Sequence, residues 1–245
     1  MRRTGLVLLA LALALTGCET TAEKSAKLEA AAKRQEQAAT STARAPRAPS
    51  ITRTSTVVKV LAGSVLRSSA AAAAVVTVRN LSGAALRDVP IEITVRSASG
   101  SSLYTNDMPG LADGLADIPL LAAHGELTWV DDQVPANGAP SSVSAKIGEG
   151  ERVTAPSPPL SVSATTLSDG SASEPSAEGS VVNHSALAQS EVVVYALARR
   201  AGRIVAAGRA LLAQAAAASA TRFQLYFVGD PRGAQLQFSA VAGAA

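Results

Sequence analysis

Few side chains in this chain have the types and spacing that catalysis or metal binding requires. His124 and His184 are its only histidines, and they lie in the turn-like contexts Ala-His-Gly and Asn-His-Ser, one in each half. A zinc site usually combines several His and Cys ligands at short, fixed spacing. We therefore interpret both histidines as turn residues rather than as metal ligands.

Three aspartates, Asp107, Asp113 and Asp117, lie in one glycine-bearing segment. Their spacing does not match the calcium loop of an EF-hand, and no bidentate glutamate follows them. The chain also lacks the motifs of phosphate loops, dinucleotide-binding sites and serine hydrolases. We expect no catalytic residue, no cofactor and no metal site, and therefore a protein that is not an enzyme.

Trp129 and two asparagines could each serve in binding or in packing. Trp129 could stack on a sugar, but it shares a strand face with Leu127, which favours a place in the core. Asn80-Leu-Ser82 and Asn183-His-Ser185 have the pattern of glycosylation sites. They recur at equivalent places in the two halves, and asparagine closes turns by hydrogen bonds to nearby backbone. We expect a turn role for both asparagines.

The composition and the distribution of charge exclude nucleic-acid binding. Hydrophobic residues make up 47%, so a core can form, but aromatic residues make up only 3%. Residues 1–55 carry a net charge of +5, whereas residues 56–245 hold 13 basic and 15 acidic groups, a net charge of −2. A nucleic-acid interface needs basic groups clustered on a folded face, and the basic excess lies in the N-terminal segment instead.

The N-terminal segment has the layout of an export signal. Arg2 and Arg3 precede an apolar run of ten residues, Leu6–Leu15. A helix that spans a bilayer needs about 20 apolar residues, so the run indicates the core of a signal peptide. Cys18 follows shortly after and is the only cysteine of the chain, which excludes an intrachain disulfide.

The tetrapeptide Leu15-Thr16-Gly17-Cys18 resembles the lipobox of bacterial lipoproteins. The resemblance implies that residues 1–17 are removed, that the Cys18 thiol receives diacylglycerol, and that acyl chains such as palmitate hold the protein at a bacterial membrane. In that family an Asp after the cysteine often marks inner-membrane retention, so Glu19 favours the outer membrane where the organism has one. The alternative is an ordinary secretory signal with an incidental cysteine.

Residues 18–54 are expected to form a lipid-anchored tether. Residues 22–39 are rich in Ala, Glu, Lys and Gln, which favour a partly formed, solvated helix. Residues 40–54 are rich in Ser, Thr, Pro and Ala, which is typical of a disordered linker. We interpret the tether as a spacer, and contact of its basic side chains with anionic headgroups or wall polymers is the alternative.

The remainder of the chain has the pattern of short β-strands. Val89, Ile91, Ile93 and Val95 alternate with polar residues and Pro90, which predicts a half-buried strand. Two copies of one unit are visible, because Val89 follows Asn80 by nine positions and Val192 follows Asn183 by nine. The fold class predicted is all-β, with two tandem immunoglobulin-like sandwiches at residues 55–153 and 160–245 and a linker at 154–159.

Each copy is expected to close with a β-hairpin. In the first copy the strands 127–130 and 142–147 flank a turn that contains Asn137-Gly138. In the second copy the strands 223–228 and 236–241 flank the turn 230–233. Two alanine-rich runs lie outside this pattern. Residues 69–74 are expected to begin a weak strand, and residues 213–220 to form a loop or a single helical turn.

The second copy, from Glu178 to Val228, resembles the FxLYD type of domain found in bacterial surface lipoproteins. The match lies in residues 182–185, the strand that contains Tyr195, residues 202–205, and Phe223. The chain departs from that pattern at Ala198-Arg199-Arg200, where the family usually has an Asp. The resemblance implies a sandwich and brings no catalytic residues.

These features leave two classes of function. In the first, the protein is a non-catalytic lipoprotein of the cell envelope, and its sandwiches bind or space another protein or a wall polymer. In the second, it is an accessory subunit of an envelope transporter or enzyme complex. Both classes place the chain at a membrane through lipid on Cys18.

Overall fold

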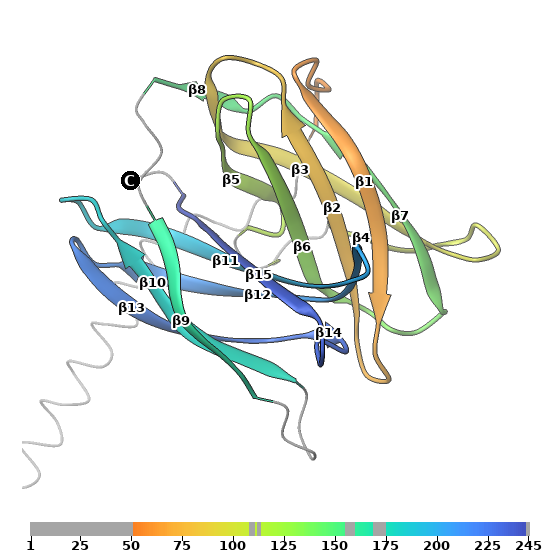
Figure 1. Cartoon of the computed structure of the whole chain (residues 1–245). Coiled ribbons are helices and arrows are strands. Elements are labelled where there is room, and N and C mark those ends of the chain that lie inside the picture. The colour runs from red at the N-terminus through yellow and green to blue at the C-terminus, as the bar shows by residue number, and fades with distance from the viewer. Residues whose placement is uncertain (1–50, 108–110, 112–113, 155–159, 169–174, 244–245) are drawn as a thin grey trace, which may run out of the picture. The chain divides into compact units, whose positions relative to one another are not determined.

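The computed structural model describes residues 51–107, 111, 114–154, 160–168 and 175–243. In this part of the chain strands are the only regular elements (Figure 1). The described residues belong to one compact unit, Pro46–Ala245. The expected signal peptide, Cys18 and nearly all of the expected tether lie outside the described residues.

The described residues form eight strands in the first half of the chain and seven in the second. The first eight are β1 (Val58–Arg67), β2 (Ala72–Asn80), β3 (Ala85–Ser97), β4 (Ser102–Thr105), β5 (Asp117–Leu121), β6 (Glu126–Val134), β7 (Pro140–Ile147) and β8 (Glu151–Val153). The other seven are β9 (Leu160–Ser168), β10 (Ser176–Asn183), β11 (Gln189–Arg200), β12 (Arg203–Ala215), β13 (Ser219–Tyr226), β14 (Val228–Gly229) and β15 (Gln235–Val241).

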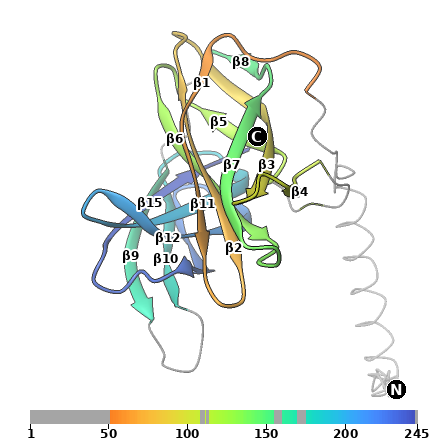
Figure 2. The ribbon, with the colours of Figure 1, turned by 90° about the vertical axis from the view of Figure 1, so that its right-hand side faces the viewer.

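Two antiparallel sheets enclose the core of the first half. One has the order β1-β2-β6, and in the other the long strand β3 pairs with β4, β5, β7 and β8. Figure 2 shows β7 alongside β3 and β1 alongside β2. Val89, Ile91, Ile93 and Val95 are all fully buried in this core. The alternation in the sequence is therefore confirmed as a half-buried strand.

The second half repeats the arrangement of the first. Its sheets have the orders β13-β10-β9 and β14-β12-β11-β15. β9, β10 and β13 correspond to β1, β2 and β6, and β11 corresponds to β3. The all-β sandwich architecture expected from the sequence is thus confirmed.

The turn role expected for Asn80 and Asn183, the asparagines of the two Asn-x-Ser motifs, is confirmed. Asn80 and Asn183 are buried, and the side-chain amide nitrogen of each donates to three backbone carbonyls at 2.7–3.4 Å. The acceptors are Ala84, Leu121 and Ala122 in the first half, and Leu187, Ala215 and Ala216 in the second. The Oδ1 atoms accept from the backbone and hydroxyl of Ser82 and Ser185. Each asparagine therefore holds the turn that follows it against a second turn of the same half.

The two expected closing hairpins are wrong. β6 pairs with β2 and β7 pairs with β3, so the segment between them crosses from one sheet to the other. The turn itself is present, since Gly138 and Ala139 have φ values of +74° and +52°. β13 and β15 likewise belong to different sheets, on β10 and β11. The turn residues in the sequence correctly predicted where the chain reverses direction. They did not predict which strands pair in a sheet.

Strand β11 is buried on both faces. Val192, Val194, Ala196 and Ala198 lie in the core of the second half. The residues between them, Val193, Tyr195 and Leu197, belong to the core cluster of the first half. The second half therefore contributes one face of β11 to the apolar core of the first half. Separating the two halves would expose this apolar surface to water.

The alanine-rich runs form strands rather than helices. The first run leads into β2, whose first five residues, Ala72–Val76, are all buried. The second run contains the end of β12, a tight turn that includes Ala218 at φ +47°, and the start of β13. A helical turn is therefore wrong for residues 213–220, while a loop is confirmed between two strands.

Candidate functional site

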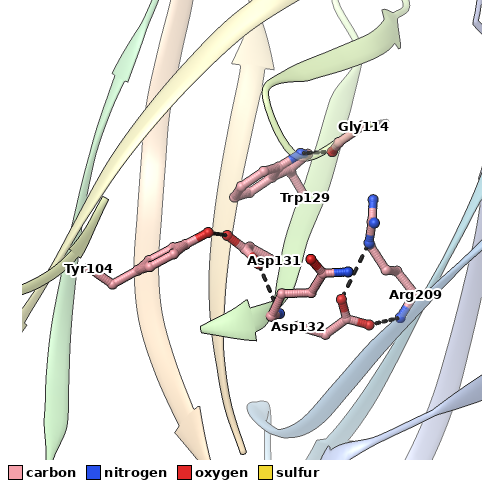
Figure 3. A network of polar contacts seen from close by, with 7 residues as sticks. Tyr104, Gly114, Trp129, Asp131, Asp132 and Arg209 are labelled. Carbon is pink, nitrogen blue, oxygen red and sulfur yellow. Dashed lines mark hydrogen bonds and ion pairs between the residues drawn. The ribbon is translucent and has the colours of Figure 1, made fainter. Parts of the chain in front are cut away.

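Buried charged and polar side chains gather where β6 of the first half meets β12 of the second. Asp131 and Asp132 are consecutive on β6, so their side chains leave the strand on opposite faces. Figure 3 shows Asp131 directed toward Tyr104 and Asp132 directed toward Arg209. Trp129 and Gly114 lie beside this group.

Asp131 is completely buried and is held by two donors. The Tyr104 hydroxyl donates to its Oδ2 at 2.9 Å, and the backbone N–H of Gln133 donates to its Oδ1 at 2.9 Å. Burial raises the pKa of the Asp131 carboxyl, and the two hydrogen bonds oppose that shift. Burial and the nearby Asp131 charge also raise the pKa of Tyr104, so its hydroxyl keeps its proton and remains a donor.

Asp132 makes an ion pair with Arg209, which lies on β12. The Arg209 Nε donates to Oδ1 at 3.3 Å, and its backbone N–H donates to Oδ2 at 3.3 Å (Figure 3). The Arg209 side chain is only 5% exposed and that of Asp132 is 20% exposed. Burial raises the pKa of Asp132, and the Arg209 charge opposes the shift. Removing either member of a pair this buried would be destabilising, because the remaining charge would be neither paired nor solvated.

Gly114 connects this network to the core. The Trp129 indole N–H donates to its carbonyl oxygen at 2.8 Å (Figure 3). Gly114 has φ +74°, and a Cβ atom there would lie 3.0 Å from Val193 and 3.4 Å from the Arg209 guanidinium. Both the backbone conformation and the available space therefore require glycine. Trp129 is fully buried, which confirms the expected core packing.

Tyr195 is the one buried side-chain polar group of the described residues that has no hydrogen-bond partner. It pairs in register with Arg209 and is 1% exposed. Burial raises its pKa, so the hydroxyl is neutral. An unpartnered buried hydroxyl is a destabilising feature at the junction of the two halves.

A surface hollow of about 500 Å³ adjoins the network. Its lining comprises Ser102, Leu103, Tyr104, Thr105, Leu111, Gln133 and Pro135. A small molecule in the hollow would meet the side of Tyr104, because Asp131 is completely buried. Tyr104 binds the Asp131 carboxylate within the first half, and Arg209 binds the Asp132 carboxylate across the two halves. The Asp132–Arg209 pair therefore has a structural role, which is to hold one half against the other.

The candidate ligands that lie among the described residues are not brought together as a metal site. His124 is exposed in a turn, and His184 contacts the Ser161 hydroxyl at 2.8 Å. Asp107 lies in the loop after β4 and Asp117 begins β5, while Asp113, like Cys18, lies outside the described residues. Among the described residues no group of three or more His, Cys, Asp or Glu side chains could hold a metal ion. In the same part of the chain no helix is long and apolar enough to cross a membrane.

Sequence reasoning missed the whole network of Tyr104, Asp131, Asp132 and Arg209. Two signals were present in the sequence. Asp131-Asp132 interrupts the apolar strand that begins at Leu127, and Arg209 stands within the Ala- and Leu-rich strand β12. A charged residue inside a buried strand requires a partner. The partner of Asp132 lies in the other half of the chain and that of Asp131 lies 27 positions away, so no local spacing identifies either.

Comparison of the chain with protein-family models and with curated proteins found no match.

Proposed function

We propose that this protein is a non-catalytic lipoprotein of a bacterial cell envelope. Lipid on Cys18 anchors it to the membrane, and its β-sandwich halves bind or space an envelope partner. The observation that carries the proposal is the N-terminal sequence. Arg2 and Arg3, the apolar run Leu6–Leu15 and Leu15-Thr16-Gly17-Cys18 follow each other in the order of a lipoprotein signal.

The architecture supports a role in binding or spacing. Val193, Tyr195 and Leu197 of the second half pack into the core of the first half, and the buried pair Asp132–Arg209 connects strands of the two halves. A unit joined in this way keeps its surfaces in a fixed relationship, whereas two sandwiches on a loose linker would not. The expected tether of residues 18–54 would allow this unit to reach a partner away from the membrane.

Mass spectrometry of the mature N-terminus tests the proposal chemically. The full chain is expressed in a bacterial host, extracted from membranes with detergent and digested with protease. We expect a first peptide that begins at Cys18 and carries diacylglycerol on the thiol. A mature N-terminus at another position, together with an unmodified Cys18, would contradict the proposal. The Cys18→Ser variant is the matched control, since serine offers no thiol for acylation.

A further inference from the structure

Four arginines meet at one end of the second half. Arg199 and Arg200 end β11, Arg203 begins β12, and Arg232 lies in the turn between β14 and β15. Arg200 pairs with Arg203 in register, and its guanidinium donates to the backbone carbonyl of Arg232. We call these four residues, with the adjacent Asp230, the arginine tip. Its members come from two adjoining turns of one sheet.

The charge of the arginine tip is largely uncompensated. Asp230 is bound to Arg232 through both carboxylate oxygens, at 2.8 Å and 3.2 Å, and Arg232 holds the pKa of Asp230 below its usual value. Arg199, Arg200 and Arg203 form no ion pair with any carboxylate of the described residues. The arginine tip therefore has a net charge of +3, although residues 56–245 together have a net charge of −2.

A tight turn presents these arginines to solvent. Ala201 and Gly202 have φ values of +49° and +77°, as a two-residue hairpin turn with the twist of the flanking strands requires. Arg200, Arg203 and Arg232 are exposed, and Arg199 is half-buried. Like charges this close repel each other, and Arg199, Arg200 and Arg203 have no carboxylate of the described residues in an ion pair to offset their charge. An anionic surface outside the molecule would relieve that repulsion.

We propose that the arginine tip docks on the anionic phospholipid headgroups of the membrane to which the protein is anchored. This inference rests on the proposed lipid anchor for its biological setting. A tether as long as residues 18–54 would leave the orientation of the sandwich unit undetermined. Basic residues close to an anionic leaflet each strengthen binding roughly fivefold. Three arginines at one turn, without an ion pair among the described residues, would therefore set which end of the unit faces the lipid.

Co-sedimentation with vesicles tests the proposal. The full chain carrying Cys18→Ser, which cannot be acylated there, is mixed with phosphatidylcholine vesicles or with vesicles that contain about 30% phosphatidylglycerol. We expect binding to the anionic vesicles that weakens as salt is added. The triple variant R199Q/R200Q/R203Q should reduce that affinity by about tenfold or more. Because this protein has no anchor at residue 18, the result is independent of the proposed acylation.

The matched control removes three positive charges from positions outside the arginine tip. Lys59, Arg79 and Arg152 are exposed cations without ion pairs, and K59Q/R79Q/R152Q also lowers the net charge by three. We expect this control to change the affinity less than twofold. Equal losses in the two triple variants would show attraction to overall charge, and no loss in either would show binding by another segment. Either result would overturn the proposal.

A fluorescent label tests whether the arginine tip itself contacts the lipid, in a protein that keeps all four arginines. In the Cys18→Ser chain, Ala201→Cys provides a single thiol at the arginine tip, and Ala98→Cys provides one in the exposed turn after β3. An environment-sensitive dye at residue 201 should shift to shorter wavelength on anionic vesicles, with a smaller shift at residue 98. Equal shifts at the two positions, or no shift at residue 201, would contradict docking through the arginine tip.

Discussion

Arg209 and Asp132 form an ion pair between strands of different halves, with Nε and Oδ1 3.3 Å apart although the residues are 77 positions apart in the sequence. The pair lies at the edge of an apolar core to which both halves contribute. One buried charge pair thus depends on the correct packing of the two sandwiches, and it offers a direct probe of that packing.

A double-mutant cycle on this pair should show strong coupling. Arg209→Met leaves the mostly buried Asp132 carboxylate without its partner, and such a loss costs about 3–5 kcal/mol. Asp132→Asn in the same chain removes the stranded charge, so the double variant should recover a large part of that loss. Urea unfolding of the two single variants, the double variant and the parent measures the coupling. Strictly additive, small effects would show that the two halves do not depend on the pair.

The two tyrosines beside the network should respond oppositely to loss of the hydroxyl. Tyr195→Phe removes a buried hydroxyl that has no partner, so we expect the free energy of unfolding to rise by up to about 1 kcal/mol. Tyr104→Phe removes the donor to Asp131, and we expect a loss of about 1–3 kcal/mol. Thermal melts of the two variants compare them directly. A destabilising Tyr195→Phe change would mean that this hydroxyl has a partner.

Asp131 should make the folded state less stable as the pH rises. Its pKa is raised by burial, so the folded chain holds the proton at a pH where the unfolded chain has released it. The stabilisation is complete below the unfolded pKa, near pH 4, and is lost as the pH rises through the folded pKa. Asp131→Asn removes this dependence. The variant should therefore gain stability relative to the parent as the pH rises above about 4, as measured by urea unfolding. A relative loss over that range would contradict the direction of the shift.

Strand β3 allows its two faces to be tested at adjacent positions. Ile93 is fully buried, so Ile93→Asp puts an unpaired carboxylate into the core at a cost of several kcal/mol. Thr94 lies on the other face and is half-buried, and Thr94→Asp should change stability by about 0.5 kcal/mol at most. Thermal melts of the full chain compare the two. Equal destabilisation would mean that the strand is buried on both faces.

Local features of the fold could be predicted from the sequence because their causes are local. The alternation around Ile93 follows from the period of a strand with one face in a core. The roles of Asn80 and Asn183 follow from the reach of an asparagine side chain to backbone within its own turn. In both cases a few neighbouring residues determine the outcome.

Pairing between distant strands could not be predicted in the same way. The turn at Gly138 is clear in the sequence, but whether β7 returns to β6 or crosses to β3 depends on the core that the sheets enclose. β11 showed no alternation because the second half packs one of its faces against the first half. The Asp132–Arg209 pair depends on that same packing, so the sequence around either residue could not reveal it.

Fractionation of the Cys18→Ala variant tests the proposed anchoring most directly. The parent chain and the variant are expressed in the same bacterial host, and membranes are collected by centrifugation and washed with high salt to remove proteins held by charge alone. We expect the parent to remain in the membrane pellet and the variant to be released into the soluble fraction, because lipid on Cys18 is the proposed anchor. A Cys18→Ala protein that still pellets after the salt wash would contradict the account.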